Sequence, residues 1–132
     1  RLHWKGIESA YNSSPYFEFY RDTFEPYYKK SFVFLLDLCV RMNDDILNVL
    51  GITQKSVLSK EFLFPSDNPG VSDLRQLIHP KKSIELNTDF RIFEYQQVFS
   101  QTHGFIPGLS ILDLIFNMGP ESGKMLRGAS KE

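Results

Sequence analysis

The longest apolar pattern in the chain repeats with the period of a helix. Large apolar side chains recur at alternating intervals of four and three residues, at Tyr28, Phe32, Leu35, Cys39, Met42, Ile46 and Val49. This spacing forms one stripe, and charged residues fall off it, at Asp37, Arg41, Asp44 and Asp45. Gly51 follows at a position where glycine commonly ends a helix. The pattern predicts one long helix over about residues 24–50, with Leu35 in its buried face.

Shorter helical patterns lie on both sides of this segment. One stripe opens the chain and is formed by Trp4, Ile7 and Tyr11. Residues 12–15 break it, Ser14 is expected to cap a second short helix, and Thr23 is expected to cap the long one. Near the other end, residues 110–117 predict a largely apolar helix that Gly119 closes. A last helix is expected from Pro120 to about Arg127, which gives a C-terminal helix pair.

The middle of the chain has a different pattern. Residues 56–64 and 90–99 are rich in Phe, Val, Ile, Leu and Tyr and predict short β-strands. Turn-forming residues at 65–70 predict a loop, and residues 73–78 predict a short helix. Taken together, the patterns predict a mainly α, single domain over residues 1–132, built around the helix at 24–50.

Composition limits the classes of function. The 132 residues are 42% hydrophobic and 23% charged, as in an ordinary globular domain with one core. The net charge of -1 provides no basic excess for a nucleic-acid backbone, so nucleic acid is not an expected partner. The single Cys39 favours a reducing compartment, and no apolar run is long enough to predict a membrane span. Metal and nucleotide motifs are absent, so no metal site is predicted and the cofactor stays unknown.

The predicted helix at 110–117 carries the most informative polar residues. Ser110, Asp113 and Asn117 fall on one stripe of a helix that is otherwise apolar. A buried carboxylate needs partners, so this stripe either lines a site or satisfies local structure. Ser110 and Asp113 also have the spacing of a capping box. Both interpretations are open at the level of the sequence.

Other polar residues are candidates for binding. The segment Tyr95-Gln96-Gln97 provides an amide at Gln97, and His103 lies beside a glycine in a predicted loop. Glu121 lies in the first turn of the last predicted helix. The run His79-Pro80-Lys81-Lys82 has charges that suit a phosphate, although adjacent lysines are usually a solvated turn.

Several of these segments resemble the WbqC-like family, named after a protein of bacterial O-antigen gene clusters. The resemblance covers most of the chain and is carried by residues 3–11 (HWKGIESAY), 14–18 (SPYFE), 95–99 (YQQVF) and 103–121 (HGFIPGLSILDLIFNMGPE). The last run is the longest and the most specific. The chain departs from the family pattern at Gly108, where many members have Asn, and at Met118, where some have an acid.

The resemblance implies a bacterial, cytoplasmic protein linked to surface polysaccharide. Family members begin with a separate motif-bearing region that has no counterpart here. The chain opens without Met, and a helical pattern is already running at Trp4. We therefore expect these residues to be the C-terminal fragment of a longer chain, with an incompletely covered face that promotes self-association.

Two hypotheses about function follow. The first is a group transferase of polysaccharide biosynthesis that acts on an activated sugar. In it, Asp113 is the catalytic base, and the substrate-binding residues are Asn117, Gln97, His103, Ser110 and Glu121. The ligand would be a sugar or a nucleotide sugar. The alternative is a non-catalytic binding or assembly partner in the same pathway, in which the polar stripe only caps a helix.

Overall fold

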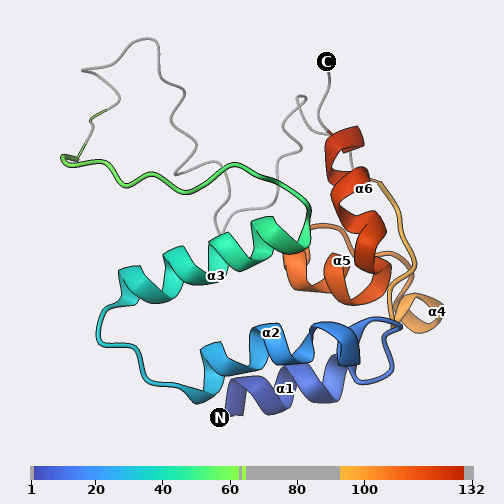
Figure 1. Ribbon diagram of the computed structural model, residues 1–132. Coiled ribbons are helices and arrows are strands. Elements are labelled where there is room, and N and C mark those ends of the chain that lie inside the picture. Colours follow the sequence, from blue (N-terminus) through green and yellow to red (C-terminus); the bar gives the residue numbers. More distant parts are fainter. Residues whose placement is uncertain (1, 63, 65–92, 130–132) are drawn as a thin grey trace.

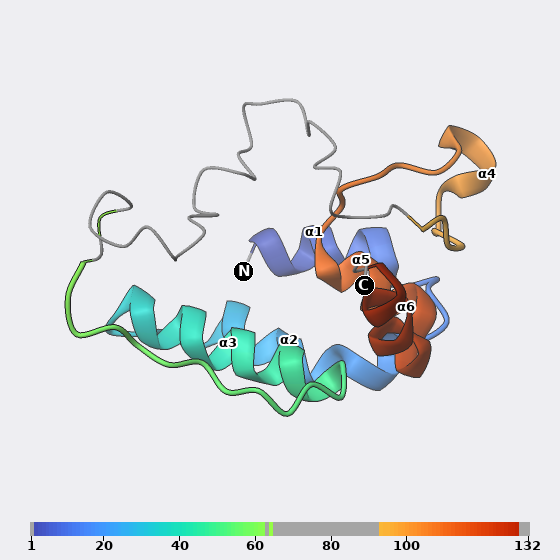
Figure 2. The ribbon, with the colours of Figure 1, turned by 90° about the horizontal axis from the view of Figure 1, so that it is seen from above.

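The protein is mainly helical, as the sequence predicts. The computed structural model describes residues 2–62, 64 and 93–129 (Figure 1). Its helices are α1 (Leu2–Tyr11), α2 (Phe17–Lys29), α3 (Leu35–Val49), α4 (Ser100–His103), α5 (Ile111–Met118), the 3-10 turn η2 (Gly119–Glu121) and α6 (Ser122–Ala129). Successive helices α1, α2 and α3 run in alternating directions, and α5 and α6 lie at one end of this group (Figures 1 and 2).

Helix α1 is the predicted opening helix, whereas α2 joins the predicted second short helix to the start of the predicted long one. Trp4 is buried, and Arg21 donates a hydrogen bond of 2.8 Å to Glu8 across the pair. The predicted caps are wrong. Helix α2 begins at Phe17, whose N–H binds the main-chain carbonyl of Ser14 at 3.3 Å, and Thr23 lies inside the helix. The side chain of Ser14 is therefore not needed to satisfy this helix end.

The predicted long helix over residues 24–50 is wrong, because the structure divides it. Helix α2 ends at Lys29, Lys30 is extended, and α3 begins at Leu35. An unbroken helix of this length would extend about 40 Å with few partners, whereas a turn lets α3 pack against α2. One hydrogen bond and one ring contact hold the turn closed: the Tyr27 hydroxyl donates to Asp45, and the Tyr27 and Phe32 rings stack 5.9 Å apart.

Leu35 is not in the core, contrary to the expectation from the stripe. Its side chain is 74% exposed, because α3 starts there and turns its other side toward α2. We predict that Leu35→Ala lowers the free energy of unfolding by less than about 0.5 kcal/mol, since exposed substitutions have small effects. Urea unfolding of the variant beside the unsubstituted protein measures this difference. A loss of about 2 kcal/mol or more, as for a core leucine, would contradict the structure.

The two predicted β-strands, at 56–64 and 90–99, are also wrong. The described residues form no strand, and Val57 and Phe62 are 91% and 68% exposed. A strand needs a neighbouring strand for its main-chain groups, and none of the described residues provides one. Residues 63 and 90–92, the predicted loop at 65–70, the predicted helix at 73–78 and the run His79-Pro80-Lys81-Lys82 lie outside the described residues.

Phe116 is the centre of the hydrophobic core. It is fully buried on α5, and its ring contacts three others at centroid distances of 5.3 Å (Tyr11), 5.1 Å (Phe17) and 5.9 Å (Phe24). The core therefore joins α1 and α2 to α5. This packing fixes how α5, which carries the polar stripe, is rotated relative to its neighbours.

The predicted C-terminal helix pair is present as α5 and α6. Gly119 joins them with a φ of 53°, a conformation that favours glycine. Helix α6 packs closely on the end of α3, since a Cβ on Gly123 would lie 2.0 Å from the carbonyl oxygen of Leu50. Gly51 ends α3 as the sequence predicts, with a φ of 66°. The pair is thereby anchored to the rest of the fold.

Candidate functional site

Asp113 is carried into the interior by an apolar helix. Its neighbours on α5 are buried on most sides, at Leu112, Leu114, Ile115 and Phe116. Asp113 itself is 3% exposed, which removes water as its main hydrogen-bond partner. Burying a carboxylate in this way is costly unless protein donors replace water. The identity of those donors decides what Asp113 can do.

The side chains of Tyr95, Gln97 and Asn117 donate hydrogen bonds to Asp113, and we call these four residues the Asp113 network. The Tyr95 hydroxyl donates to Oδ2 at 2.7 Å, and the Gln97 Nε2 donates to the same oxygen at 3.2 Å. Asn117 Nδ2 donates to Oδ1 at 3.3 Å and to the main-chain carbonyl of Asp113 at 2.8 Å. No ion pair joins Asp113 to a cation in the described part of the chain. Among the described residues, the donors that hold the carboxylate are neutral.

The Asp113 carboxylate contributes to raised pKa values of two tyrosines, Tyr11 and Tyr95. Burial, together with the charge of Asp113 and a hydrogen bond to it, raises the pKa of Tyr11 well above its usual range. Burial also raises the pKa of Tyr95 to about 12, with the hydrogen bond to Asp113 and its charge adding to the shift while Gln97 opposes it. Both phenols are therefore neutral near pH 7, and Tyr95 keeps its proton directed at Asp113.

The raised pKa of Tyr95 predicts a loss of stability at high pH. The folded state holds this proton more tightly than the unfolded state, whose tyrosines ionise near pH 10. The stabilising contribution is complete below about pH 10 and is lost as the pH rises toward 12. We expect Tyr95→Phe to reduce the decline in the free energy of unfolding over this window. Equal declines for the two proteins, measured by urea unfolding at several pH values, would contradict the assignment.

Gln97 holds protein groups, although the sequence suggests it as a substrate ligand. It is 4% exposed; its Nε2 donates to the carbonyl of Ile106 at 2.9 Å as well as to Asp113, and its Oε1 accepts the N–H of Ile106 at 2.9 Å. Both amide protons are used. Gln97 therefore ties the loop before α5 to the carboxylate, and we interpret it as a positioning residue.

The structure separates the other sequence candidates. Ser110 is the N-cap of α5, and its Oγ accepts the N–H of Leu112 at 3.3 Å. His103 is the exposed last residue of α4, and Glu121 is exposed and paired with Lys124 at 2.9 Å. Asp113, Asn117 and Gln97 are brought together. Within the part of the chain that the structure describes, no hydrogen bond joins His103 or Glu121 to them.

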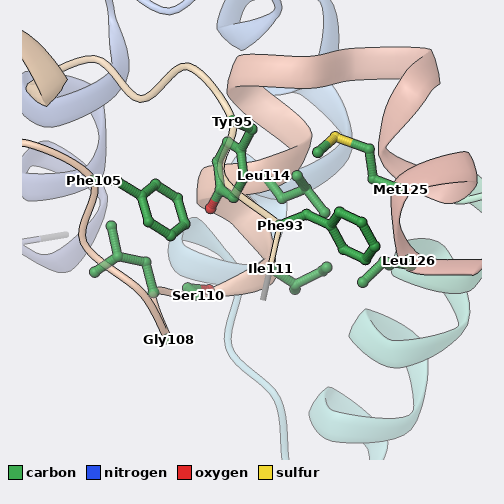
Figure 3. Close-up of a pocket in the computed structure, with 10 residues that line it drawn as sticks. Phe93, Tyr95, Phe105, Gly108, Ser110, Ile111, Leu114, Met125 and Leu126 are labelled. Carbon is green, nitrogen blue, oxygen red and sulfur yellow. The ribbon is translucent and has the colours of Figure 1, made fainter. Parts of the chain in front are cut away.

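A cavity of about 320 Å³ borders the Asp113 network (Figure 3). It is lined by Phe93, Tyr95, Phe105, Gly108, Leu109, Ser110, Ile111, Leu114, Met125 and Leu126. Figure 3 shows the Tyr95 oxygen directed toward α5, and the rings of Tyr95 and Phe105 meet edge to face, 5.4 Å apart. Tyr95 is thus the member of the network that also lines the cavity.

Sequence reasoning missed the roles of Tyr95 and Tyr11. Tyr95 and Gln97 are two residues apart, so they point to the same side of an extended segment, and this signal was present in the sequence. Tyr11 was assigned only to a helical stripe. Its closeness to Asp113 depends on how α1 packs against α5 through Phe116, which no local pattern encodes.

A second cavity of about 560 Å³ has a different lining. Its residues come from α1, α2 and α3 and are Leu2, His3, Tyr27, Tyr28, Leu38 and Met42. It shares no lining residue with the first cavity and contains no member of the Asp113 network. A site that combines a cavity with a buried ionisable group is therefore found at α5.

The described residues contain neither a metal-binding cluster nor a membrane-spanning helix. Across residues 2–62, 64 and 93–129, no group of three or more His, Cys, Asp or Glu side chains lies together as a metal site requires. Of the helices that the structure describes, none combines the length and apolar character needed to cross a membrane.

Fold and site together define a helical domain in which a buried carboxylate, held by neutral donors, lies beside an aromatic cavity. The sequence profile of the WbqC-like protein family matches residues 1–78 and 66–125. These segments overlap and reach from residue 1 to residue 125, so the chain belongs to this family. No curated protein and no solved structure matches it.

Proposed function

We propose that the protein is a group transferase of bacterial surface-polysaccharide biosynthesis that acts on an activated sugar in the cytoplasm. The family supports the pathway, and the Tyr95–Asp113 pair beside the cavity supports the reaction type. The observation on which this proposal depends is that the buried carboxylate of Asp113 accepts a hydrogen bond from the hydroxyl of Tyr95, which lines the cavity. Such a pair suits the removal of a proton from an acceptor hydroxyl or amine.

The pair can work without direct contact between Asp113 and the ligand. Tyr95 donates its own proton to Asp113, so its oxygen is directed to accept a hydrogen bond from a ligand O–H or N–H. As the acceptor attacks, its proton passes to the Tyr95 oxygen and the Tyr95 proton passes to Asp113. Tyr95 stays neutral throughout, in agreement with a pKa of about 12.

A ligand screen tests this proposal. Nucleotide-activated sugars are added to the protein, and its melting temperature is recorded, because a ligand that binds the native state raises stability. We expect a rise of several degrees with at least one of them, and a smaller rise in Tyr95→Phe. No shift with any activated sugar would contradict the proposal.

The second candidate function is a non-catalytic assembly partner. One observation favours it: a continuous exposed apolar segment between α2 and α3, with Val33 at 88% and Phe34 at 65% exposure. Apolar surface of this kind promotes association with a partner or a second copy. The assembly function predicts self-association or complex formation that Phe34→Asp weakens, together with normal polysaccharide production by Tyr95→Phe.

A further inference from the structure

The first cavity is suited to an uncharged ligand. None of its described lining residues carries a charge at neutral pH. Its volume of about 320 Å³ is at the lower end of ligand pockets, which span roughly 300–1,000 Å³. Among these described residues, a diphosphate would lose hydration without gaining a cation. The cavity therefore fits one neutral part of a larger ligand.

Most of the lining suits an aliphatic chain. Aromatic and aliphatic side chains surround the space, at Phe93, Phe105, Leu109, Leu114, Met125 and Leu126. Met125 and Leu126 come from α6, Leu114 comes from α5, and the rings come from the segment before α5 (Figure 3). Apolar contact with a chain of methylene groups is the main attraction such a surface offers.

Two polar atoms at the cavity match an amide. Tyr95 donates its proton to Asp113, so it faces a ligand as an acceptor, which suits an N–H. Ser110 accepts the N–H of Leu112 through Oγ, and its own hydroxyl proton is not used in that bond. Ser110 can therefore donate to a carbonyl oxygen. One acceptor and one donor beside an apolar space are complementary to a secondary amide with an acyl chain.

We propose that this cavity binds the acyl group of an N-acylated amino sugar, with the amide between Tyr95 and Ser110. The proposal rests on the proposed function for the sugar and for the reaction. There, a sugar amine forms a bond to the carbonyl carbon of an acyl thioester, and the carbon–sulfur bond breaks with its electron pair going to sulfur. The proton lost from nitrogen passes through Tyr95 to Asp113. The N-acylated sugar is the product.

Binding of product analogues tests the cavity. Dissociation constants are measured by calorimetry for N-acetyl-, N-butanoyl- and N-hexanoyl-glucosamine. We expect affinity to rise up to about fourfold for each added methylene until the cavity is full. The ester 2-O-hexanoyl-glucose lacks the N–H, so we expect it to bind about tenfold more weakly than the amide, and we expect Tyr95→Phe to remove most of this difference. Affinity independent of chain length, or equal for amide and ester, would overturn the proposal.

A matched pair of variants tests whether the acyl chain of the ligand lies in the first cavity. Leu109 lines the cavity and is 44% exposed, so Leu109→Asp introduces a charge at the rim without opening the core. Leu36 is 55% exposed on α3 and lines neither cavity. We expect Leu109→Asp to weaken the binding of N-hexanoyl-glucosamine by about tenfold or more, and Leu36→Asp to leave this affinity unchanged. The two variants are expected to have similar melting temperatures. Equal effects of the two variants would overturn the placement.

The outcomes separate this proposal from the proposed function. A shift with activated sugars but no dependence on acyl chain length would leave the transferase proposal standing and reject the acyl cavity. A chain-length series that follows the prediction, together with normal polysaccharide production by Tyr95→Phe, would support the acyl cavity and reject the transferase.

Discussion

Replacing Asp113 with Asn is expected to lower activity by at least about 100-fold, the usual scale for losing a general base. The substitution keeps the shape of the side chain but removes the charge that receives the proton from Tyr95. It also costs stability, since the new Nδ2 faces the amide donors of Gln97 or Asn117. We expect a loss of about 1–3 kcal/mol in the free energy of unfolding.

Two measurements on the same variant separate these effects. Restoration of surface polysaccharide in cells that lack the protein reports activity, and urea unfolding reports stability. A variant that is destabilised as expected but supports normal polysaccharide production at permissive temperature would contradict a catalytic role. Asp113 would then be a structural acceptor that holds Tyr95, Gln97 and Asn117 in place.

Replacing Phe116 with Ala is expected to have the largest effect on stability. The side chain is fully buried among rings from α1 and α2, and the fold cannot refill the space without moving two helices. Truncating a buried phenylalanine costs about 3–5 kcal/mol through lost transfer energy and a cavity. Urea unfolding measures the loss.

Phe19 provides the matched control for this prediction. It is 75% exposed on α2, so Phe19→Ala removes the same number of atoms from a solvated position. We expect its cost to stay below about 0.5 kcal/mol. Similar losses for Phe19→Ala and Phe116→Ala would mean that α5 does not pack against α1 and α2 as described.

Local sequence signals predicted the helical segments other than α4, but not where the helices pack or break. Three of these signals depend only on neighbours in sequence, and the structure contains each of them. They are the apolar stripe that begins at Trp4, the end of α3 at Gly51 and the capping of α5 by Ser110. The division between α2 and α3 depends on the gain from folding α3 back against α2, which no period reveals. Leu35 is exposed for the same reason, since its place in the stripe predicts burial only if the helix is unbroken.

The failure of the strand predictions has a related cause. Residues 93–99 have strand-forming composition, but composition does not supply a neighbouring strand. The Gln97 side chain in this segment instead binds the main chain of Ile106, in the loop before α5. Tertiary contacts therefore decide the conformation of this segment.

The candidate site was predictable in part. An aspartate and an asparagine on one stripe of an apolar helix indicated buried polar groups, and the structure joins Asp113 and Asn117. Tyr95 and Tyr11 come from segments far away in the chain, and their approach to Asp113 follows from core packing. His103 was selected as a histidine in a predicted loop and Glu121 for its place in the first turn of a predicted helix, and the structure leaves both exposed.

The most direct test of the central claim compares two tyrosines that make the same kind of hydrogen bond. Tyr95 donates to the buried Asp113 beside the first cavity, and Tyr27, which lines the second cavity, donates to the half-buried Asp45. Each Phe substitution removes one hydroxyl, and we expect each to cost about 1 kcal/mol. The measurement is surface-polysaccharide production by cells that carry each variant at equal protein abundance. The proposed function predicts a loss of at least about 100-fold for Tyr95→Phe and normal production for Tyr27→Phe; normal production by both would contradict it.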